Sequence, residues 1–233
     1  MNNGKKTIVA LILAAGIGSR MRSPITKQQL NISGLSVLKR CVMPFVLSKS
    51  ISAIVVVCRA EELEFAKSEL SDVLSKPIIY TVGGDTRRES ARLGFLAVKD
   101  ACDFVAIHDG ARCLVTEKII DEVCSAAIRY GAATASAKIT DTIKLSEDGY
   151  TVSTLDREKL YSVQTPQVFA REIYSRAIEN AGDISVTDDN ALAEALGVRV
   201  KLVDTGRENI KITTPEDVSY AEYVIKKREK CDG

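Results

Sequence analysis

A run of apolar, mostly β-branched residues at positions 7–13 leads straight into a loop of small residues, and this junction constrains the fold more than any other stretch. An uninterrupted apolar run is typical of a parallel strand covered on both faces. Small residues after it let backbone N–H groups approach an anion, and glycine permits φ values that a side chain would forbid. The junction therefore predicts a buried strand that ends in a phosphate-binding loop, formed by Ala14, Ala15, Gly16 and Gly18.

Two cations follow the small residues of this loop. Arg20 offers a planar guanidinium and Lys27 a mobile point charge, and both suit the oxygens of a triphosphate. The loop is not a dinucleotide-binding fingerprint, because Met21 stands where that motif has its third glycine, and no Gly-Lys-Ser/Thr follows as a Walker loop requires. A Gly-x-Gly alone is usually only a turn, so the hypothesis of a phosphate site depends on the two cations.

Loop and cations together resemble the nucleotidyltransferase loop of the superfamily that contains sugar-nucleotide pyrophosphorylases and cytidylyltransferases. The resemblance rests on Gly-Ile-Gly-Ser-Arg-Met at 16–21 and Lys-Gln-Gln-Leu at 27–30. Members of that superfamily usually have proline before this lysine, where this chain has Thr26. We therefore expect a less rigid approach to Lys27.

The overall charge excludes several classes of partner. The 233 residues carry 32 Lys and Arg against 31 Asp and Glu, a net charge of +1, so no overall field attracts nucleic acid or an acidic membrane surface. No segment reaches the roughly 20 apolar residues that span a bilayer. A chain of this length with 45% hydrophobic residues predicts one α/β domain, and any anion site in it must be local.

The six cysteines contain no Cys-x-x-Cys pair, and the only histidine, His108, cannot complete a zinc cluster. We expect reduced, mostly buried thiols and a cytoplasmic protein. An alternative interpretation takes Lys5, Lys6 and the apolar run after them as a secretory signal peptide, although cleavage would remove the strand of the phosphate loop.

Strand and helix patterns alternate along the chain, as in a parallel sheet built from βαβ units. Apolar runs predict strands, and amphipathic stretches predict helices. The strands are expected at 51–58, 78–82, 104–108, 132–139 and 198–203, and the helices at 61–70, 86–98, 116–130, 171–180, 188–196 and from 214 onward. The prediction is a three-layer α/β/α sandwich with a mainly parallel, Rossmann-like sheet, formed by residues 1–139 and 162–233, with ligands at the carboxyl ends of the strands.

Residues 140–161 interrupt this rhythm with alternating polar and β-branched residues around Glu-Asp-Gly at 147–149, a hairpin signal. The segment is too polar for a core strand pair. We expect a projecting β-arm, which would be marginally stable alone and would therefore pack on a partner subunit in a homodimer.

Residues 83–90 read Gly-Gly-Asp-Thr-Arg-Arg-Glu-Ser, after a predicted strand and at the start of a helix. Taken alone, the segment is equally well a tight turn with a helix cap. It resembles the Gly-Gly-x-x-Arg-x-x-Ser element with which cytidylyltransferases hold cytosine and ribose, and that resemblance implies nucleoside contacts from Gly84, Asp85 and Ser90. Arg87 or Arg88 is alternatively a solvated helix charge.

Residues 108–112 read His-Asp-Gly-Ala-Arg at the end of another strand. The Asp109 carboxylate, beside a triphosphate loop, is a reasonable Mg²⁺ ligand, because magnesium prefers one or two carboxylates plus phosphate oxygens. The alternative is a capping aspartate paired with Arg112. We assign His108 to structure, bonded to backbone. The family pattern continues with proline, which Cys113 replaces here.

Further short motifs follow in a fixed order: Asp-Thr at 141–142, Asp-Arg at 156–157, Gln-Thr-Pro-Gln at 164–167, Thr-Asp at 187–188 and Asn-Ile-Lys-Ile-Thr at 209–213. Each one alone could be an ordinary turn or surface pair. Together they resemble the cytidylyltransferases that act on methylerythritol phosphate, over roughly residues 8–224. Lys211, expected at a strand end, is either a third phosphate-directed cation or a surface lysine.

The resemblance implies cytidylyl transfer from CTP to 2-C-methyl-D-erythritol 4-phosphate with Mg²⁺ as cofactor and release of pyrophosphate. Arg20, Lys27 and Lys211 would stabilise the pentavalent phosphorus, with Asp109 at the metal. The residues that would hold the acceptor phosphate and polyol are Asp109, Arg112, Thr142, Arg157, Thr165 and Thr187. Two alternatives stay open: ribitol 5-phosphate as the acceptor, and a non-catalytic nucleotide-binding regulator on the same fold.

Overall fold

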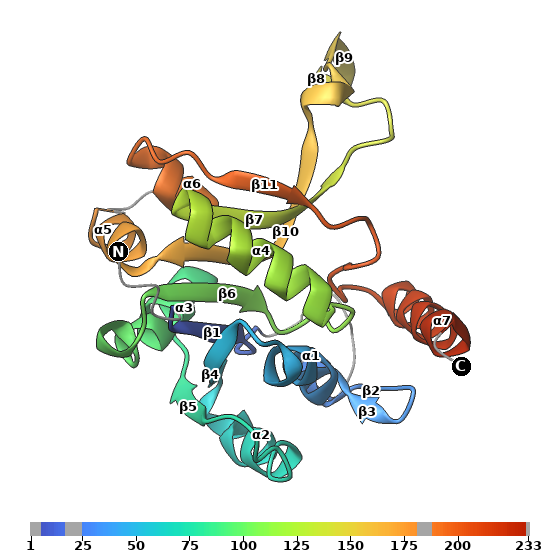
Figure 1. Ribbon diagram of the computed structural model, residues 1–233. Helices are drawn as coiled ribbons and strands as arrows, with labels where there is room; N and C mark the ends of the chain where they lie inside the picture. The colour runs from blue at the N-terminus through green and yellow to red at the C-terminus, as the bar shows by residue number, and fades with distance from the viewer. Residues whose placement is uncertain (1–5, 17–24, 181–187, 232–233) are drawn as a thin grey trace.

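The computed structural model describes residues 6–16, 25–180 and 188–231, and its centre is one twisted sheet (Figure 1). Seven strands lie in the order β11-β7-β10-β6-β1-β4-β5. Their bounds are β1 Ile8–Leu13, β4 Ile51–Cys58, β5 Ile78–Val82, β6 Phe104–Asp109, β7 Ala132–Lys138, β10 Tyr161–Ala170 and β11 Lys201–Asp204. All neighbours pair in parallel except β10, which is antiparallel to both β6 and β7. The predicted mainly parallel sheet is confirmed.

Strand β1 is buried on both faces, as its uninterrupted apolar sequence predicts. Ile8, Ala10 and Ile12 belong to the core on one side of the sheet, and the residues between them belong to the core on the other side. The strand pairs with β4 along one edge and β6 along the other. These residues are a central strand of the domain, which a cleaved signal peptide could not supply.

Helices cover both faces of the sheet and give three layers (Figure 1). One core contains residues of α1 Val37–Leu47, α2 Leu63–Glu69, α4 Glu117–Tyr130 and α7 Pro215–Cys231. The opposite core contains residues of α3 Arg87–Leu96, α5 Arg171–Glu179 and α6 Asp189–Ala195. Short elements connect them: β2 Asn31–Ile32, β3 Leu35–Ser36 and the 3₁₀ turns η2 Lys27–Gln29, η3 Ala60–Glu62, η4 Lys99–Ala101 and η5 Arg157–Lys159. No helix in the described ranges is long and apolar enough to cross a bilayer.

Helix α1 and strand β10 were absent from the sequence prediction, as were the short strands β2 and β3. Helix α1 has a clear start, where the Ser36 hydroxyl accepts a hydrogen bond from the backbone N–H of Lys39, but Pro44 lies inside it and obscures the helical pattern. Strand β10 contains the polar Gln-Thr-Pro-Gln motif, and proline is uncommon within a sheet. Its register against β7 is irregular between Val163 and Gln167, which accommodates that motif. Lys211, expected at a strand end, lies in a non-strand segment between β11 and α7.

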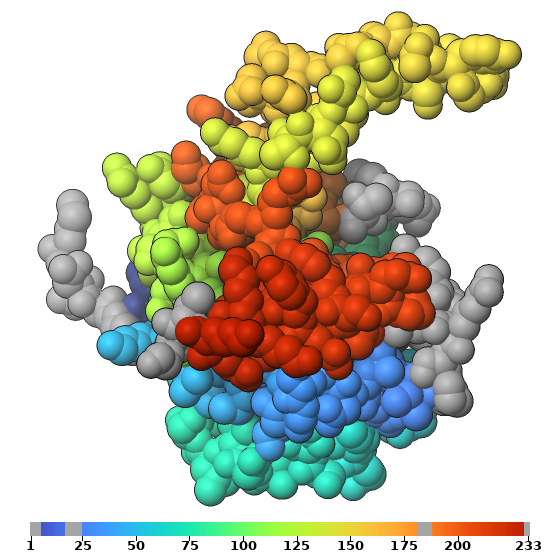
Figure 2. All heavy atoms as spheres, turned by 90° about the vertical axis from the view of Figure 1, so that its right-hand side faces the viewer, coloured from blue at the N-terminus to red at the C-terminus, as the bar shows by residue number. Residues whose placement is uncertain are grey.

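Residues 140–161 contain a separate two-stranded hairpin, β8 Lys144–Glu147 and β9 Tyr150–Thr154. Asp148 and Gly149 join the strands with φ values of 50° and 82°, the left-handed turn that the Asp-Gly signal predicts. Every residue of both strands is exposed. The hairpin extends away from the body of the domain (Figure 2), and we call residues 140–161 the arm.

Candidate active site

The carboxyl ends of β1 and β6 lie at one edge of the sheet, where they line a cavity of about 340 Å³ together with the loops that follow β1, β5 and β6. Leu13 and Asp109, the last residues of β1 and β6, lie opposite each other in the parallel register. The described lining residues come from four loops and the segment before α7: Leu13, Ala15, Gly16, Lys27, Gln28, Gly84, Asp85, Thr86, Arg87, Ser90, Asp109, Gly110, Ala111 and Lys211. These include three cations and two carboxylates, so the described lining has a net positive charge, which favours a polyanion.

The small residues of the β1 loop have different roles from those expected. The backbone N–H of Ala14 donates to the Val57 carbonyl at 2.7 Å and is therefore not directed at an anion. Gly16 lines the cavity, but its φ lies outside the left-handed region and a Cβ on it would meet no described atom. Gly16 therefore does not use the left-handed φ that glycine permits. A close approach does require glycine at Gly110, where a Cβ would lie 2.9 Å from the Leu13 carbonyl oxygen.

The predicted nucleoside loop forms the opposite wall, at the start of α3. The Thr86 hydroxyl caps this helix by accepting from the Glu89 N–H. Ser90 is buried behind the loop, where its hydroxyl accepts from the Gly84 N–H at 3.2 Å and lies 3.3 Å from the Gly84 carbonyl oxygen. Gly84 and Asp85 line the cavity. Ser90 therefore holds the loop that would meet a nucleoside.

Asp109 is the most highly connected carboxylate of the site. Its Oδ1 accepts from Arg87 Nε at 3.0 Å, and its Oδ2 lies 2.9 Å from Lys211 Nζ and 3.7 Å from Arg112 Nε. Burial by itself would raise the pKa of Asp109, but the charges of Arg87 and Lys211 outweigh burial and hold that pKa well below its ordinary value. The carboxylate is therefore ionised at neutral pH. Arg112 is only its third and most distant cation, so the simple cap interpretation of the pair is incomplete.

Arg87, for which a solvated helix charge was one interpretation, lines the cavity and contacts Asp109. Its guanidinium lies between two carboxylates, Asp109 and Asp189, and donates from Nη1 to Asp189 Oδ2 at 2.6 Å. Burial alone would lower the pKa of Arg87, but these two carboxylates raise it above its ordinary value. The solvated interpretation of Arg87 is wrong. A signal was available in the spacing, because Arg87 is the first residue of α3 and directly follows the cavity loop.

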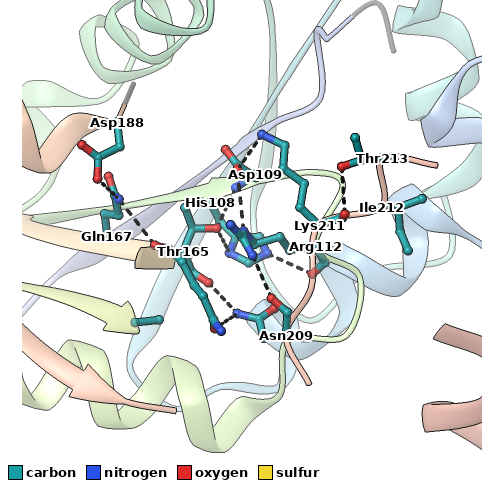
Figure 3. A network of polar contacts seen from close by, with 12 residues as sticks. His108, Asp109, Arg112, Thr165, Gln167, Asp188, Asn209, Lys211, Ile212 and Thr213 are labelled. Carbon is teal, nitrogen blue, oxygen red and sulfur yellow. Dashed lines mark hydrogen bonds and ion pairs between the residues drawn. The ribbon is translucent and has the colours of Figure 1, made fainter. Parts of the chain in front are cut away.

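His108 and Thr165 are buried next to Asp109 and are joined to each other by a hydrogen bond (Figure 3). The Asp109 N–H donates to Thr165 Oγ1 at 3.0 Å, and that hydroxyl lies 2.9 Å from His108 Nδ1. His108 Nε2 lies 3.2 Å from the Arg112 carbonyl oxygen. Burial lowers the pKa of His108 to about 4, so the ring is neutral, with the proton on Nε2 donated to that carbonyl. The structural role predicted for His108 is confirmed, and the Thr165 hydroxyl is engaged within the protein.

Asn209 attaches the segment before α7 to the same edge of the sheet (Figure 3). Its side-chain amide donates to the Thr165 carbonyl at 2.8 Å, and its own carbonyl accepts from Arg112 Nη1 at 2.8 Å. Three residues further on, the Ile212 N–H donates to the Ala111 carbonyl at 2.8 Å. Lys211 lies between these attachments and extends to Asp109, with 41% of its side chain exposed. Lys211 is thus partly exposed and is paired with a carboxylate that lines the cavity.

Lys27 is almost entirely buried, with 9% of its surface exposed, and lies in the 3₁₀ turn η2 at the cavity wall. Its Nζ donates to the Ile212 carbonyl at 3.0 Å. The ammonium of Lys27 and the segment that carries Lys211 are thus joined directly. The two lysines predicted to act on phosphate come from opposite ends of the chain and are brought to one cavity.

A second cavity, of about 240 Å³, adjoins Asp109 on the side of β10. Its described lining consists of Arg87, Asp109, Arg112, Val163, Gln164, Thr165, Gln167, Asp188 and Lys211. Arg87, Asp109 and Lys211 line both cavities. A nucleotide in the first cavity and an anionic partner in the second would meet at these three side chains.

The profile of the 2-C-methyl-D-erythritol 4-phosphate cytidylyltransferase family matches residues 8–227. This chain belongs to that family. An enzyme of that name from Caldanaerobacter subterraneus is 40% identical over 225 residues, which cover 94% of this chain and 99% of that protein. The relative from Clostridium novyi is 39% identical over 95% of this chain and 98% of its own length. Family membership assigns the chain CTP-dependent cytidylyl transfer in isoprenoid biosynthesis and confirms the resemblance.

Solved structures agree with this family assignment. The crystal structure of 4-diphosphocytidyl-2C-methyl-D-erythritol synthase from Anaerococcus prevotii superposes with a TM-score of 0.86 at 31% identity, covering 95% of this chain and 97% of that one. The Thermus thermophilus cytidylyltransferase gives a TM-score of 0.72 at 26% identity, over 96% of this chain and all of that one. The predicted three-layer α/β fold is confirmed.

Not every predicted site residue reaches the two cavities. Thr142 and Arg157 lie exposed on the arm, where Arg157 Nη1 donates to the Thr140 carbonyl at 3.1 Å and the side chain is 55% exposed. Neither residue lines either cavity. Gly18, Arg20 and Thr187 lie outside the described residues. A cytidylyltransferase site made from one chain therefore lacks the contacts expected from the arm.

The donor atoms suit a magnesium ion only in combination with substrate oxygens. In the part of the chain that the structure describes, no three or more His, Cys, Asp or Glu side chains are grouped as a metal site. Asp85 and Asp109 both line the nucleotide cavity. One or two carboxylates together with phosphate oxygens and water are the ligand set that Mg²⁺ usually takes. The residues therefore fit a metal that arrives with a nucleoside triphosphate.

Proposed function

We propose that the chain transfers the cytidylyl group of CTP to 2-C-methyl-D-erythritol 4-phosphate at the two adjoining cavities, as an Mg²⁺-dependent homodimer in the cytoplasm. One observation carries the assignment of the site: Arg87, Asp109 and Lys211 lie between the cavities and line both. CTP would occupy the larger cavity, bounded by the β1 loop and the α3 loop. The acceptor phosphate would occupy the smaller cavity, beside Arg112 and Thr165.

The reaction needs alignment and charge neutralisation rather than a covalent intermediate. An oxygen of the acceptor phosphate attacks the α-phosphorus of CTP in line, a new P–O bond forms, and the bond to the β-phosphate oxygen breaks as pyrophosphate leaves. The nucleophile is already an anion, so no general base is required. Lys27 and Lys211, with Arg20 of the β1 loop, would stabilise the charge on the equatorial oxygens and the leaving group.

Asp109 is proposed to hold the metal, with Asp85 close to it. Magnesium would neutralise triphosphate oxygens during the transfer. In the ligand-free site, Lys211 pairs with Asp109 Oδ2. A triphosphate offers Lys211 a competing anion, and movement of that ammonium to phosphate would release Oδ2 for the metal.

The arm supports the proposal of a homodimer. Its strands are fully exposed and carry Leu145, Tyr150 and Val152, apolar or aromatic side chains that a second chain could cover. An arm that reaches across a two-fold axis would bring Thr142 and Arg157 to the acceptor cavity of its neighbour. A cytoplasmic location is supported by the cysteines, since the five whose side chains are described are free and buried.

The deciding experiment measures pyrophosphate release from CTP with each polyol phosphate in turn. We expect release with 2-C-methyl-D-erythritol 4-phosphate and little with ribitol 5-phosphate. The opposite preference would reassign the acceptor, and no release with either would support the non-catalytic alternative.

A magnesium titration of Asp109→Asn tests the metal: the variant should need more Mg²⁺, because an amide is a poorer ligand for a hard cation. A titration identical to that of the parent would remove Asp109 from the metal site.

A further inference from the structure

A buried tyrosine begins a chain of polar contacts that ends at Asp109. Tyr174 lies on α5 and lines neither of the two cavities, and its ring packs against Phe95 and Phe169 with centroid distances of 5.0 and 5.6 Å. Its Oη donates to Asp189 Oδ1 at 2.8 Å. Burial raises the pKa of Tyr174 well above its ordinary value, so the hydroxyl keeps its proton and acts as a donor.

Asp189 is held on several sides at the first residue of α6. Its side chain is 2% exposed, its Oδ2 accepts from Arg87, and its backbone N–H donates to Gln167 Oε1 at 3.0 Å. Gln167 in turn donates from Nε2 to the helix-capping Asp188 at 2.9 Å. A buried carboxylate of this kind is costly unless it is paired, and here both oxygens have partners.

The consequence for Asp109 follows from the shape of arginine. A guanidinium is planar and rigid, so the bond from Nη1 to Asp189 also sets the direction in which Nε points. Arg87 Nε is the donor to Asp109 Oδ1. Without Asp189, this cation would be available to pair with Asp109 alone or to turn toward the phosphates of a bound nucleotide.

We infer that Tyr174 and Asp189 are positioning residues: they hold Arg87 so that one oxygen of Asp109 stays occupied and the other faces Lys211 and the substrates. Neither residue is in the described lining of the two cavities of the site, so both act through Arg87 rather than on substrate. The inference rests on the proposed function, in which Asp109 serves at the reacting phosphates. Nothing in the motifs around residues 171–180 pointed to this role.

The test removes one hydroxyl and keeps the ring. Tyr174→Phe is compared with Tyr80→Phe, a partly buried tyrosine of β5 packed on the opposite core. We expect kcat of pyrophosphate release to fall about 3–10-fold in Tyr174→Phe, which is the range for one lost hydrogen bond. In Tyr80→Phe, kcat should stay within twofold of the parent value. The KM for CTP should change less than twofold.

A double-mutant cycle separates positioning from a general structural effect. If Tyr174 acts through Asp109, Tyr174→Phe should leave kcat nearly unchanged in an Asp109→Asn background measured at saturating Mg²⁺. An equal loss of kcat in both backgrounds would overturn the inference, and so would an unchanged kcat in the parent background. Failure of the proposed function gives a different result, because the unaltered protein would then release no pyrophosphate with either polyol phosphate.

Discussion

The edge of the sheet and the arm both carry predicted site residues, but those at the edge that are described contact other groups of the chain, whereas those on the arm are exposed. At the edge, Asp109 is buried and contacts cations from α3, from the loop after β6 and from the segment before α7. On the arm, Thr142 and Arg157 are exposed and line no cavity. Side chains at the edge are thus positioned within one chain, whereas those of the arm have no such support. This difference is the basis for the proposal that a second chain covers the arm.

The physical basis of the contrast is burial. A two-stranded hairpin by itself is only marginally stable, and here its exposed surface includes Tyr150 at 80% exposure. Polar groups at the edge are packed in protein, where hydrogen bonds and ion pairs are stronger than in water. Loss of a contact at the edge should therefore be costly in a single chain, and loss of a contact on the arm should matter only in an assembly.

The largest expected effect is on turnover, through the buried ammonium at the edge. Lys27→Ala should lower turnover by about 10²–10³-fold with CTP binding largely retained, the loss typical of one charge-stabilising donor. Lys118→Ala, an exposed lysine of α4, is the matched control and should stay within twofold. Pyrophosphate release and CTP titration measure the two quantities. Unchanged turnover in Lys27→Ala would exclude this lysine from the mechanism.

Next in size is a loss of stability at the edge. Asn209→Ala removes a fully buried amide that donates to Gln164 and to the Thr165 carbonyl. The free energy of unfolding should fall by about 2–3 kcal/mol, because buried partners lose their hydrogen bonds. Asn180→Ala, whose exposed amide donates to the Arg176 carbonyl in the last turn of α5, should change it by less than about 0.5 kcal/mol. Urea denaturation followed by circular dichroism compares them, and equal losses in both variants would contradict this account of the edge.

Recovery of activity in a refolded mixture of two variants tests the arm. Lys27→Ala and Arg157→Ala, each nearly inactive, are unfolded together and refolded as a mixture. If each arm serves the neighbouring site, half of the dimers are mixed and one of their two sites is intact, so activity should return to roughly a quarter of normal. As the control, Lys27→Ala mixed with Lys211→Ala should recover nothing, since both lysines serve the same cavity of one chain. Recovery no better than the average of the two variants, with mixed dimers present, would show that Arg157 serves its own subunit.

The smallest expected effect is a decrease in the free energy of unfolding at acidic pH. His108 has a pKa of about 4 when folded and an ordinary value near 6.5 when unfolded, so between these values the unfolded state binds the extra proton. Stability should therefore fall as pH decreases, by about 1 kcal/mol between pH 7 and 5.5. His108→Asn should lack this contribution. Denaturation at several pH values measures it, and a parent and variant with parallel pH profiles would contradict the buried neutral ring.

The sequence motifs identified much of the site because they lie where strands end. A buried strand followed by small residues, and a second strand ending in Asp109, place both loops at one edge of a parallel sheet, whatever the details of packing. Lys27 and Lys211 were found from motifs alone. Helix α1 and strand β10 were missed because each contains a proline, Pro44 or Pro166. Proline is locally unfavourable inside a helix or a strand, and tertiary packing outweighs that local preference here.

The sequence by itself determined the parallel sheet, the two lysines that line the cavity and the exposed hairpin, because alternation, apolar runs, short motifs and turn residues act over a few neighbouring positions. Only the tertiary structure decided that Arg87 lies between Asp109 and Asp189, that Thr165 bonds to His108, and that Lys27 meets Ile212. Those pairs are separated by 22, 102, 57 and 185 residues. No local preference encodes such contacts, since they form only when packing of the two cores brings distant polar groups into a region without enough water to satisfy them.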